Sequence, residues 1–249
     1  MELTRKQLEN IMFVDIETVS VVETYDELPE RFQKLWDKKT KILNRRNDTD
    51  KEPGEWFSDQ AGVSAEFGKV VCISAGFIKY VNDRPTFRAK SYYGDDELAL
   101  LKEFGEAMNQ FMARPGRQLC AHNGKDFDFP YLGRRYLING LPLPTAIADM
   151  QNKKPWEIRV LDTMHLWKFG EFKSFASLDL LTACLGVPSP KDDIDGSEVG
   201  NVYYKENDVA RIARYCEKDV LATAQVMLRF GRQPIIAEED FHSMSFGDS

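Results

Sequence analysis

Short runs of apolar residues along the chain predict five β-strands. The second and third runs are separated only by Asn82, Asp83, Arg84 and Pro85, so they are expected to form an antiparallel hairpin. The fifth run is short and leads directly into a helix. The five runs begin at residues 11, 69, 86, 118 and 159 and end at residues 17, 79, 92, 122 and 161.

Apolar residues spaced three and four apart predict helices between and after these strands. The expected helices cover residues 95–112, the second half of 123–138, 177–185 and 207–230, and Gly231 is a natural stop for the last one. A hairpin followed by strands that alternate with helices is typical of a mixed sheet flanked by helices. The sequence therefore predicts an α/β fold, and its 249 residues fit a single domain spanning residues 1–249.

Two segments stand apart from this pattern. Residues 25–66 look like a charged insertion between the first two strands, in which Leu28, Phe32 and Trp36 have roughly helical spacing. Residues 44–54 contain no apolar side chain and are expected to be a mobile loop. A solvated surface helix and loop explains the insertion more simply than a lid over a substrate. Residues 233–249 show little periodicity, which is typical of a partly disordered tail.

Composition narrows the functional classes. The formal net charge of −7 argues against a broad basic surface for duplex nucleic acid, although a narrow basic groove remains compatible with it. The four cysteines form no CxxC pair, so a zinc knuckle or a redox motif is not indicated. Residues 1–10 do not resemble a signal peptide, and no apolar run is long enough to span a membrane. A cytoplasmic protein with reduced thiols and no membrane partner is expected.

The first strand carries two acids in an otherwise apolar stretch. Asp15 and Glu17 alternate with Val14 and Ile16, and residues two apart on a strand point to the same side. Two neighbouring carboxylates repel each other, and burying them is costly unless something offsets their charge. Mg²⁺ and Mn²⁺ prefer carboxylate oxygens, so the pair is a candidate metal site. A strand end at which both acids are hydrated is the simpler alternative.

Two later stretches carry further candidates. Asp128 lies two residues before Pro130, where the N-cap of a helix is expected, so capping alone can explain it. Tyr215 and Asp219 are four residues apart on the last long helix and lie one turn from each other at the edge of its apolar stripe. They could line a cleft, or Tyr215 could be half-buried beside an exposed Asp219.

Taken together, the three stretches resemble a known enzyme family. The motifs are Asp-Ile-Glu-Thr at residues 15–18, Asn-x-x-x-Phe-Asp-x-Pro-Tyr-Leu at residues 123–132, and Tyr-x-x-x-Asp at residues 215–219. They resemble the three exonuclease motifs of the DEDD superfamily in its tyrosine branch, DEDDy. The spelling is most similar to the proofreading exonuclease domain of family B DNA polymerases, in a stand-alone bacterial form. The resemblance implies a ribonuclease H-like fold with a mixed five-stranded sheet.

The resemblance also implies a chemistry. A 3′–5′ exonuclease of this type hydrolyses phosphodiester bonds with two divalent ions, Mg²⁺ or Mn²⁺. By resemblance, Asp15, Glu17, Asp128 and Asp219 hold the metals and Tyr215 orients the attacking water. Thr18, Asn123 and Phe127 match positions near the terminal nucleotides, and Phe127 could wedge against a base. For Phe127, a place in the core is an equally good explanation.

The remaining candidates have structural explanations. Asp162 precedes a helix and is expected to cap it, and His122 at a strand end is expected to be structural. Arg134 and Arg135 could contact phosphates, although surface arginines need no such role.

The favoured function is therefore hydrolysis of single-stranded DNA from its 3′ end. Single-stranded nucleic acid is then the expected partner, DNA more than RNA, and no oligomeric state is indicated. The first alternative is an exoribonuclease or oligonucleotide-degrading enzyme with the same site. The second is a catalytically inactive nucleic-acid-binding module, which the complete set of four acids and a tyrosine argues against.

Overall fold

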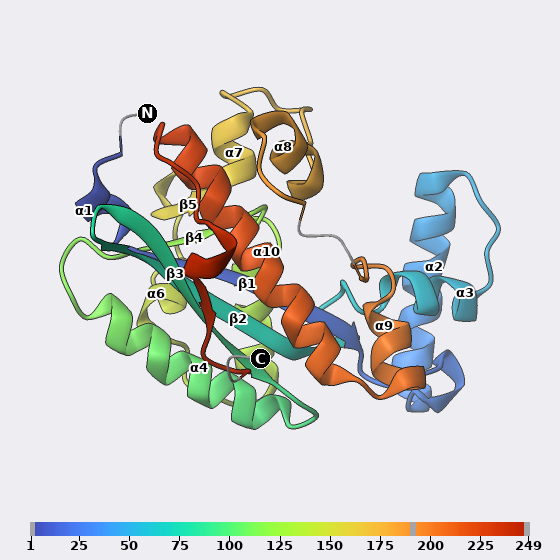
Figure 1. Cartoon of the computed structure of the whole chain (residues 1–249). Helices are drawn as coiled ribbons and strands as arrows, with labels where there is room; N and C mark the ends of the chain where they lie inside the picture. Colours follow the sequence, from blue (N-terminus) through green and yellow to red (C-terminus); the bar gives the residue numbers. More distant parts are fainter. Residues whose placement is uncertain (1–2, 190–192, 247–249) are drawn as a thin grey trace.

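A mixed six-stranded sheet with helices on both faces forms the centre of the molecule (Figure 1). The computed structural model describes residues 3–189 and 193–246. The strands are β1 (Ile11–Ser20), β2 (Gly68–Val81), β3 (Arg84–Tyr93), β4 (Gln118–Ala121), β5 (Val160–Asp162) and β6 (Phe241–Ser243), in the order β5-β4-β1-β2-β3-β6. Because β1, β4 and β5 are parallel, their carboxyl ends share one edge of the sheet.

The helices surround this sheet. They are α1 (Arg5–Leu8), α2 (Glu30–Asn47), α3 (Pro53–Gln60), α4 (Glu97–Met112), α5 (Asp128–Ile138), α6 (Thr145–Ala148), α7 (Thr163–Trp167), α8 (Leu178–Leu185), α9 (Val199–Asn201) and α10 (Val209–Phe230). Single turns of other types are η1 (Tyr25–Glu27), η2 (Pro155–Glu157), η3 (Val202–Glu206) and η4 (Glu238–Asp240).

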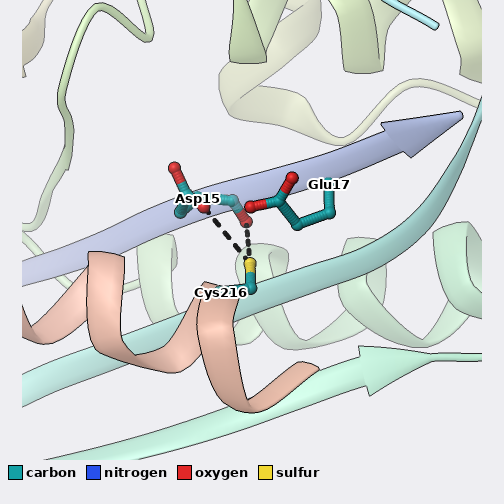
Figure 2. Close-up of side chains that lie close together, drawn as sticks. All are labelled: Asp15, Glu17 and Cys216. Carbon is teal, nitrogen blue, oxygen red and sulfur yellow. Dashed lines mark hydrogen bonds between the residues drawn. The ribbon is translucent and has the colours of Figure 1, made fainter. Parts of the chain in front are cut away.

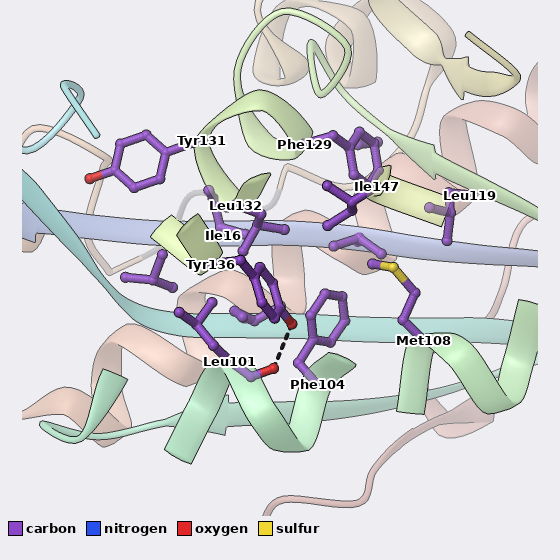
Figure 3. Close-up of a cluster of buried hydrophobic side chains, with 14 of the residues drawn as sticks. Ile16, Leu101, Phe104, Met108, Leu119, Phe129, Tyr131, Leu132, Tyr136 and Ile147 are labelled. Carbon is purple, nitrogen blue, oxygen red and sulfur yellow. Dashed lines mark hydrogen bonds between the residues drawn. The ribbon is translucent and has the colours of Figure 1, made fainter. Parts of the chain in front are cut away.

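The alternation along β1 builds two separate cores. Met12, Val14 and Ile16 face one side, where they pack with α4 and α5 in the cluster drawn in Figure 3. Phe13 faces the other side, where it packs with α10. β1 is thus buried on both faces, which explains why its sequence is almost continuously apolar.

The predicted hairpin is confirmed. β2 and β3 pair antiparallel from Cys72 opposite Tyr93 to Val81 opposite Arg84. Asn82 and Asp83 between them both have positive φ, +49° and +64°. Two such residues favour the tight turn that matches the twist of the strands it joins.

The expected strand number was one too low. β6 lies in the segment for which the sequence shows little periodicity, and it pairs parallel with β3, with Phe241 opposite Phe87. Their rings stack at a centroid distance of 6.4 Å. A three-residue strand is too short to show an alternation of its own, so only its tertiary partner defines it. Residues 247–249 of the expected disordered tail lie outside the described residues.

Between β1 and β2, α2 and α3 form a pair of helices that projects from the sheet (Figure 1). Trp36 and Phe57 are fully buried between them, and their rings pack at 5.3 Å in an edge-on contact. Phe67, just before β2, joins the same cluster. Residues 25–66 therefore have a small apolar core of their own, which is anchored where β2 begins.

The loop expected over residues 44–54 is shorter than predicted. α2 continues to Asn47, and α3 begins at Pro53. The side chain of Asn44 accepts hydrogen bonds from the backbone N–H of Lys51 (3.1 Å) and from Nε1 of Trp56 (2.6 Å), and it donates one to the carbonyl of Lys51 (2.9 Å). Composition gives no indication of these bonds, which close the turn between the two helices.

Arg135 does not have the phosphate-contacting position considered for it. It is 6% exposed, and its guanidinium donates to both carboxylate oxygens of Glu97, at 2.8 and 2.6 Å. Glu97 also accepts the backbone N–H of Val70 at 2.8 Å. This buried ion pair ties α5 to α4 and β2. Within the described part of the chain, none of the helices has the length and apolar character needed to cross a membrane.

Candidate active site

Asp15 and Glu17 interrupt the apolar contact between β1 and α10. Phe13 packs with Val220 of α10, and Val19 packs with residues one to two turns earlier on the same helix. The two acids lie between these contacts on the same side of the strand (Figure 2). Glu17 is only 9% exposed and Asp15 is half-buried. The alternative of two hydrated acids at a fraying strand end is therefore wrong.

α10 brings a second group of residues to this point. The helix starts after Asp208, whose side chain accepts the N–H of Arg211 at 2.9 Å. Two turns later Cys216 donates from Sγ to Oδ2 of Asp15 at 3.3 Å (Figure 2). One potential ligand atom each from Asp15, Glu17 and Cys216 lies within 4.8 Å of the others. Tyr215 is 7% exposed and Asp219 is half-buried, so Asp219 is not the exposed acid that the alternative assumed.

Asp128 reaches the same point from the start of α5. It is the first residue of the helix rather than its N-cap, because Phe127 has the N-cap position and makes no side-chain bond there. The carboxylate of Asp128 instead accepts backbone hydrogen bonds from its own N–H and from Ile16 of β1. With 4% of its surface exposed, Asp128 is a buried acid beside β1.

The turn before Asp128 is held by Asp162. Its carboxylate caps α7, as predicted, by accepting the N–H groups of Met164 and His165 at 3.0 and 3.2 Å. It also accepts the N–H groups of Asn123 (3.1 Å) and Lys125 (3.0 Å). This single buried carboxylate therefore links the end of β5 to the loop that positions Asp128.

The four predicted acids influence one another electrostatically. Burial raises the pKa values of Asp15 and Glu17 well above their usual range. The neighbouring carboxylates, including Asp128 and Asp219, raise them further. Burial also raises the pKa of Asp128 to about 7, with Asp162 and Asp219 adding to the effect and the backbone hydrogen bonds opposing it. Three segments far apart in the sequence thus contribute to one cluster of carboxyl groups that hold protons unusually tightly.

The phenol of Tyr215 borders this cluster. Burial raises its pKa well above the usual value, and the charges of Asp219, Glu17 and Asp15 and a hydrogen bond to Asp219 act in the same direction. A phenol with so high a pKa keeps its proton at neutral pH. It can donate a hydrogen bond but cannot serve as a base.

The chemistry of the donors fits a hard divalent cation. Carboxylate oxygens are the ligands that Mg²⁺ and Mn²⁺ prefer. A bound cation would also remove the cost that the raised pKa values express. Asp15, Glu17, Asp128 and Asp219 could all contribute such oxygens.

Comparison with known proteins identifies the family. Residues 63–243 match a family model described as a predicted 3′–5′ exonuclease related to the exonuclease domain of PolB. The chain belongs to this exonuclease family. A search of curated proteins gave no match. The family membership confirms the predicted enzyme class and the resemblance to family B polymerases.

A solved structure shows the same fold. The family B DNA polymerase from the hyperthermophilic archaeon Pyrobaculum calidifontis superposes with a TM-score of 0.57 at 14% sequence identity. The alignment covers 88% of this chain and 24% of the polymerase, so the exonuclease-family chain spans about a quarter of that protein's length. The predicted ribonuclease H-like fold in a single domain is confirmed, apart from the sixth strand.

The family match does not reach β1 of this exonuclease. Asp128, Tyr215 and Asp219 fall inside the matched residues, whereas Asp15 and Glu17 precede them. The association of the two β1 acids with the other three residues therefore rests on their position beside α5 and α10 and on their electrostatic coupling.

The three residues expected to contact substrate all make contacts within the protein. The hydroxyl of Thr18 hydrogen-bonds with Tyr131, whose phenol donates to the carbonyl of Gly62 at 2.8 Å. Asn123 has a positive φ of +63°, which suits the turn before α5. Phe127 is half-buried and packs on the ring of Tyr131 at 5.4 Å. Their contact with a nucleotide stays a prediction.

Two thiols beside the acids were not singled out from the sequence. Cys216 was assigned only to the core face of its helix, and Cys72 lies opposite Glu17 in the β1–β2 pairing. Both are fully buried, and burial followed by a hydrogen bond from Cys72 raises the pKa of Cys216 well above its usual range. The position of Cys216 next to Tyr215 was the one available signal.

Proposed function

We propose that this protein is a metal-dependent 3′–5′ exonuclease that hydrolyses single-stranded DNA from its 3′ end by a two-metal-ion mechanism. The observation that carries the proposal is the convergence of four carboxyl groups from β1, α5 and α10 on one point. Two of these acids, Glu17 and Asp128, are largely buried, with 9% and 4% of their surfaces exposed. A fold has no structural need for such a cluster, because repulsion and burial both oppose its ionisation.

Asp15, Glu17, Asp128 and Asp219 are the residues that would hold the ions. Asp15 has the central position, since its pKa is affected by both Asp128 and Asp219. Two divalent ions, when bound, supply an activated water, offset charge on the phosphate and stabilise the leaving 3′-oxygen. Cys216 fixes the orientation of the Asp15 carboxylate by its 3.3 Å hydrogen bond to Oδ2.

Tyr215 would orient the attacking water. Its phenol retains its proton and lies one helical turn from Asp219. A hydroxyl in this position can donate a hydrogen bond to a water or phosphate oxygen and so restrict its direction of approach. Since the pKa of the phenol is raised, Tyr215 positions the water and does not remove its proton.

The distribution of charge supports a nucleic-acid substrate. The chain has a net charge of −7, yet α2 alone carries seven lysines and arginines against two acids, a net charge of +5. α2 follows the carboxyl end of β1, the strand that contributes Asp15 and Glu17. A basic helix beside an acidic centre is suited to hold phosphates while cations occupy the centre. We further propose that Thr18, Asn123 and Phe127 contact the terminal nucleotides.

DNA is the favoured substrate because the structural neighbour is a DNA polymerase. RNA or short oligonucleotides would suit the same carboxylates. The proposal places the protein in the cytoplasm as one domain, with residues 25–66 as an insertion that serves the substrate.

A gel assay on end-labelled strands tests this function. Single-stranded DNA and RNA of equal sequence, labelled at the 5′ end, are incubated with the protein and Mn²⁺ or Mg²⁺. A ladder that shortens from the 3′ end on DNA, and that disappears with EDTA or in Asp15→Ala, is the expected result. Asp50→Asn, at an exposed loop position, is the matched control. Shortening from the 5′ end, or hydrolysis that survives both EDTA and Asp15→Ala, contradicts the proposal.

A further inference from the structure

The loop that joins α7 to α8 displays three phenylalanines to solvent. Phe169 and Phe172 are 93% and 94% exposed, the highest values for large apolar side chains among the described residues, and Phe175 is 73% exposed. We call residues 168–176 the aromatic loop. Apolar rings on a surface increase the contact of the folded chain with water and contribute nothing to its core. Three such rings within seven residues therefore call for a ligand.

Both ends of the aromatic loop are fixed to the segment that positions Asp128. His122, directly after β4, hydrogen-bonds through Nε2 with the carbonyl of Ala176 at 3.0 Å and through Nδ1 with the hydroxyl of Thr163 at 2.8 Å. Asp162 links α7 to the same turn by accepting the N–H groups of Asn123 and Met164. His122 thus has the structural role expected from the sequence, and that role is to hold the loop in place.

The topology puts this loop at the edge of the sheet where the acids lie. The loop follows the carboxyl end of β5, which is parallel to β4 and β1. α7 and α8, the helices on either side of it, pack against α10, the helix of Tyr215 and Asp219 (Figure 1). Trp156 is another exposed aromatic residue, at 77%, but it precedes β5 and lies at the opposite edge.

The composition of the loop favours one class of ligand. Lys168 and Lys173 alternate with the rings, and Glu171 is the only acid between residues 168 and 176. The ammonium of Lys168 lies 4.2 Å from the ring centroid of Phe175. The loop contains no Leu, Ile, Val or Met, the side chains that an apolar protein interface uses equally well. Aromatic rings interleaved with cations are the surface on which bases stack and phosphates are neutralised.

We propose that the aromatic loop is a stacking surface for the bases of a single-stranded nucleic acid whose 3′ end enters the acid cluster. This inference rests on the proposed function, since it names a binding site for the same substrate. It assigns a role to Phe169, Phe172 and Phe175 that the exonuclease motifs do not include.

Binding of a fluorescein-labelled oligothymidylate of about 15 nucleotides, measured by anisotropy in Ca²⁺ with the probe checked for integrity by gel, tests the proposal. Phe172→Leu keeps an apolar side chain and removes the ring, and it should weaken binding about fivefold, which corresponds to about 1 kcal/mol per stacked base. Replacing all three phenylalanines by leucine should weaken binding by about 10²-fold. Phe172→Trp should bind at least as tightly as the wild type, and the fluorescence of its new indole should be quenched by the strand.

Trp156→Leu is the matched control, because it removes an equally exposed aromatic ring at the other edge of the sheet. Its affinity for the probe should stay within about twofold of the wild type, a change of less than about 0.5 kcal/mol. Since all the substituted side chains are mostly exposed, the melting temperatures of the variants should agree.

Two results would overturn the stacking surface. One is a triple leucine variant that binds the probe as tightly as the wild type, and the other is an equal loss of affinity in Trp156→Leu. If the wild type hydrolyses DNA while the loop variants bind normally, only this inference fails. If the wild type neither binds nor hydrolyses single strands, the proposed function fails with it.

Discussion

In the metal-free protein, Asp128→Asn should flatten the fall in stability that occurs as the pH rises from about 4 to about 8. Burial raises the pKa of Asp128 from its ordinary value of 3.8 to about 7. The native carboxyl group therefore holds its proton more tightly than the unfolded one. The stabilisation that results is complete below the unfolded pKa and is lost as the pH rises through the native pKa.

The magnitude follows from the separation of the two pKa values. They lie about three pH units apart, and each corresponds to about 1.4 kcal/mol, so up to about 4 kcal/mol of unfolding free energy is at stake. The asparagine keeps one oxygen to accept the backbone N–H groups, and its side chain does not ionise. Its removal of a charge beside Asp15 also lowers the pKa of that acid, which acts in the same direction. We expect the stability of the variant relative to the wild type to improve by about 2–4 kcal/mol between about pH 4 and about pH 8.

Urea unfolding in EDTA at a series of pH values, followed by circular dichroism, measures this difference. Comparing the two proteins at each pH cancels any constant cost of the amide group. Asp50→Asn removes an exposed carboxylate, and its profile should run parallel to that of the wild type. If the profiles of Asp128→Asn and the wild type are also parallel, Asp128 is not the proton-holding acid that its burial implies.

Three further predictions concern the centre, the core and the insertion. Tyr215→Phe should lower single-turnover hydrolysis by about 10²-fold and leave Mn²⁺ affinity unchanged, because only the hydroxyl is lost; a wild-type rate would make the phenol structural. Arg135→Met should reduce the unfolding free energy in urea by about 3–5 kcal/mol, since it leaves Glu97 buried without its ion pair; a loss below about 1 kcal/mol would contradict this. Replacing three exposed basic residues of α2 with glutamine should weaken strand binding and lower its salt dependence by up to about 0.7 per phosphate contact, in logarithmic units; an unchanged salt slope would return α2 to a solvated surface helix. The residues are Lys38, Lys41 and Arg45.

The parts of the fold that the sequence predicts are those with a local cause. The hairpin of β2 and β3 depends on Asn82 and Asp83, which favour the turn by themselves. The side-by-side position of Asp15 and Glu17 follows from the period of a strand. The cap of α7 by Asp162 likewise needs only the neighbouring N–H groups.

The parts that the sequence does not predict depend on partners far along the chain. β6 exists because Phe241 pairs with Phe87. Asp128 resembles an N-cap until Ile16 of β1 is placed beside it. Arg135 looks like a surface cation, and only its pairing with Glu97 of α4 explains its burial. In each case the local pattern is compatible with a simpler role, and tertiary contacts decide.

The most direct test of the central claim is a Mn²⁺ titration followed by electron paramagnetic resonance, with single-turnover hydrolysis measured on the same samples. The account predicts that the wild type binds Mn²⁺ and that hydrolysis increases with the bound fraction. Asp15→Asn should lose both, and Asp50→Asn should lose neither. Equal Mn²⁺ binding in the wild type and Asp15→Asn, or hydrolysis by protein without bound metal, would contradict the assignment of the acid cluster as the catalytic metal centre.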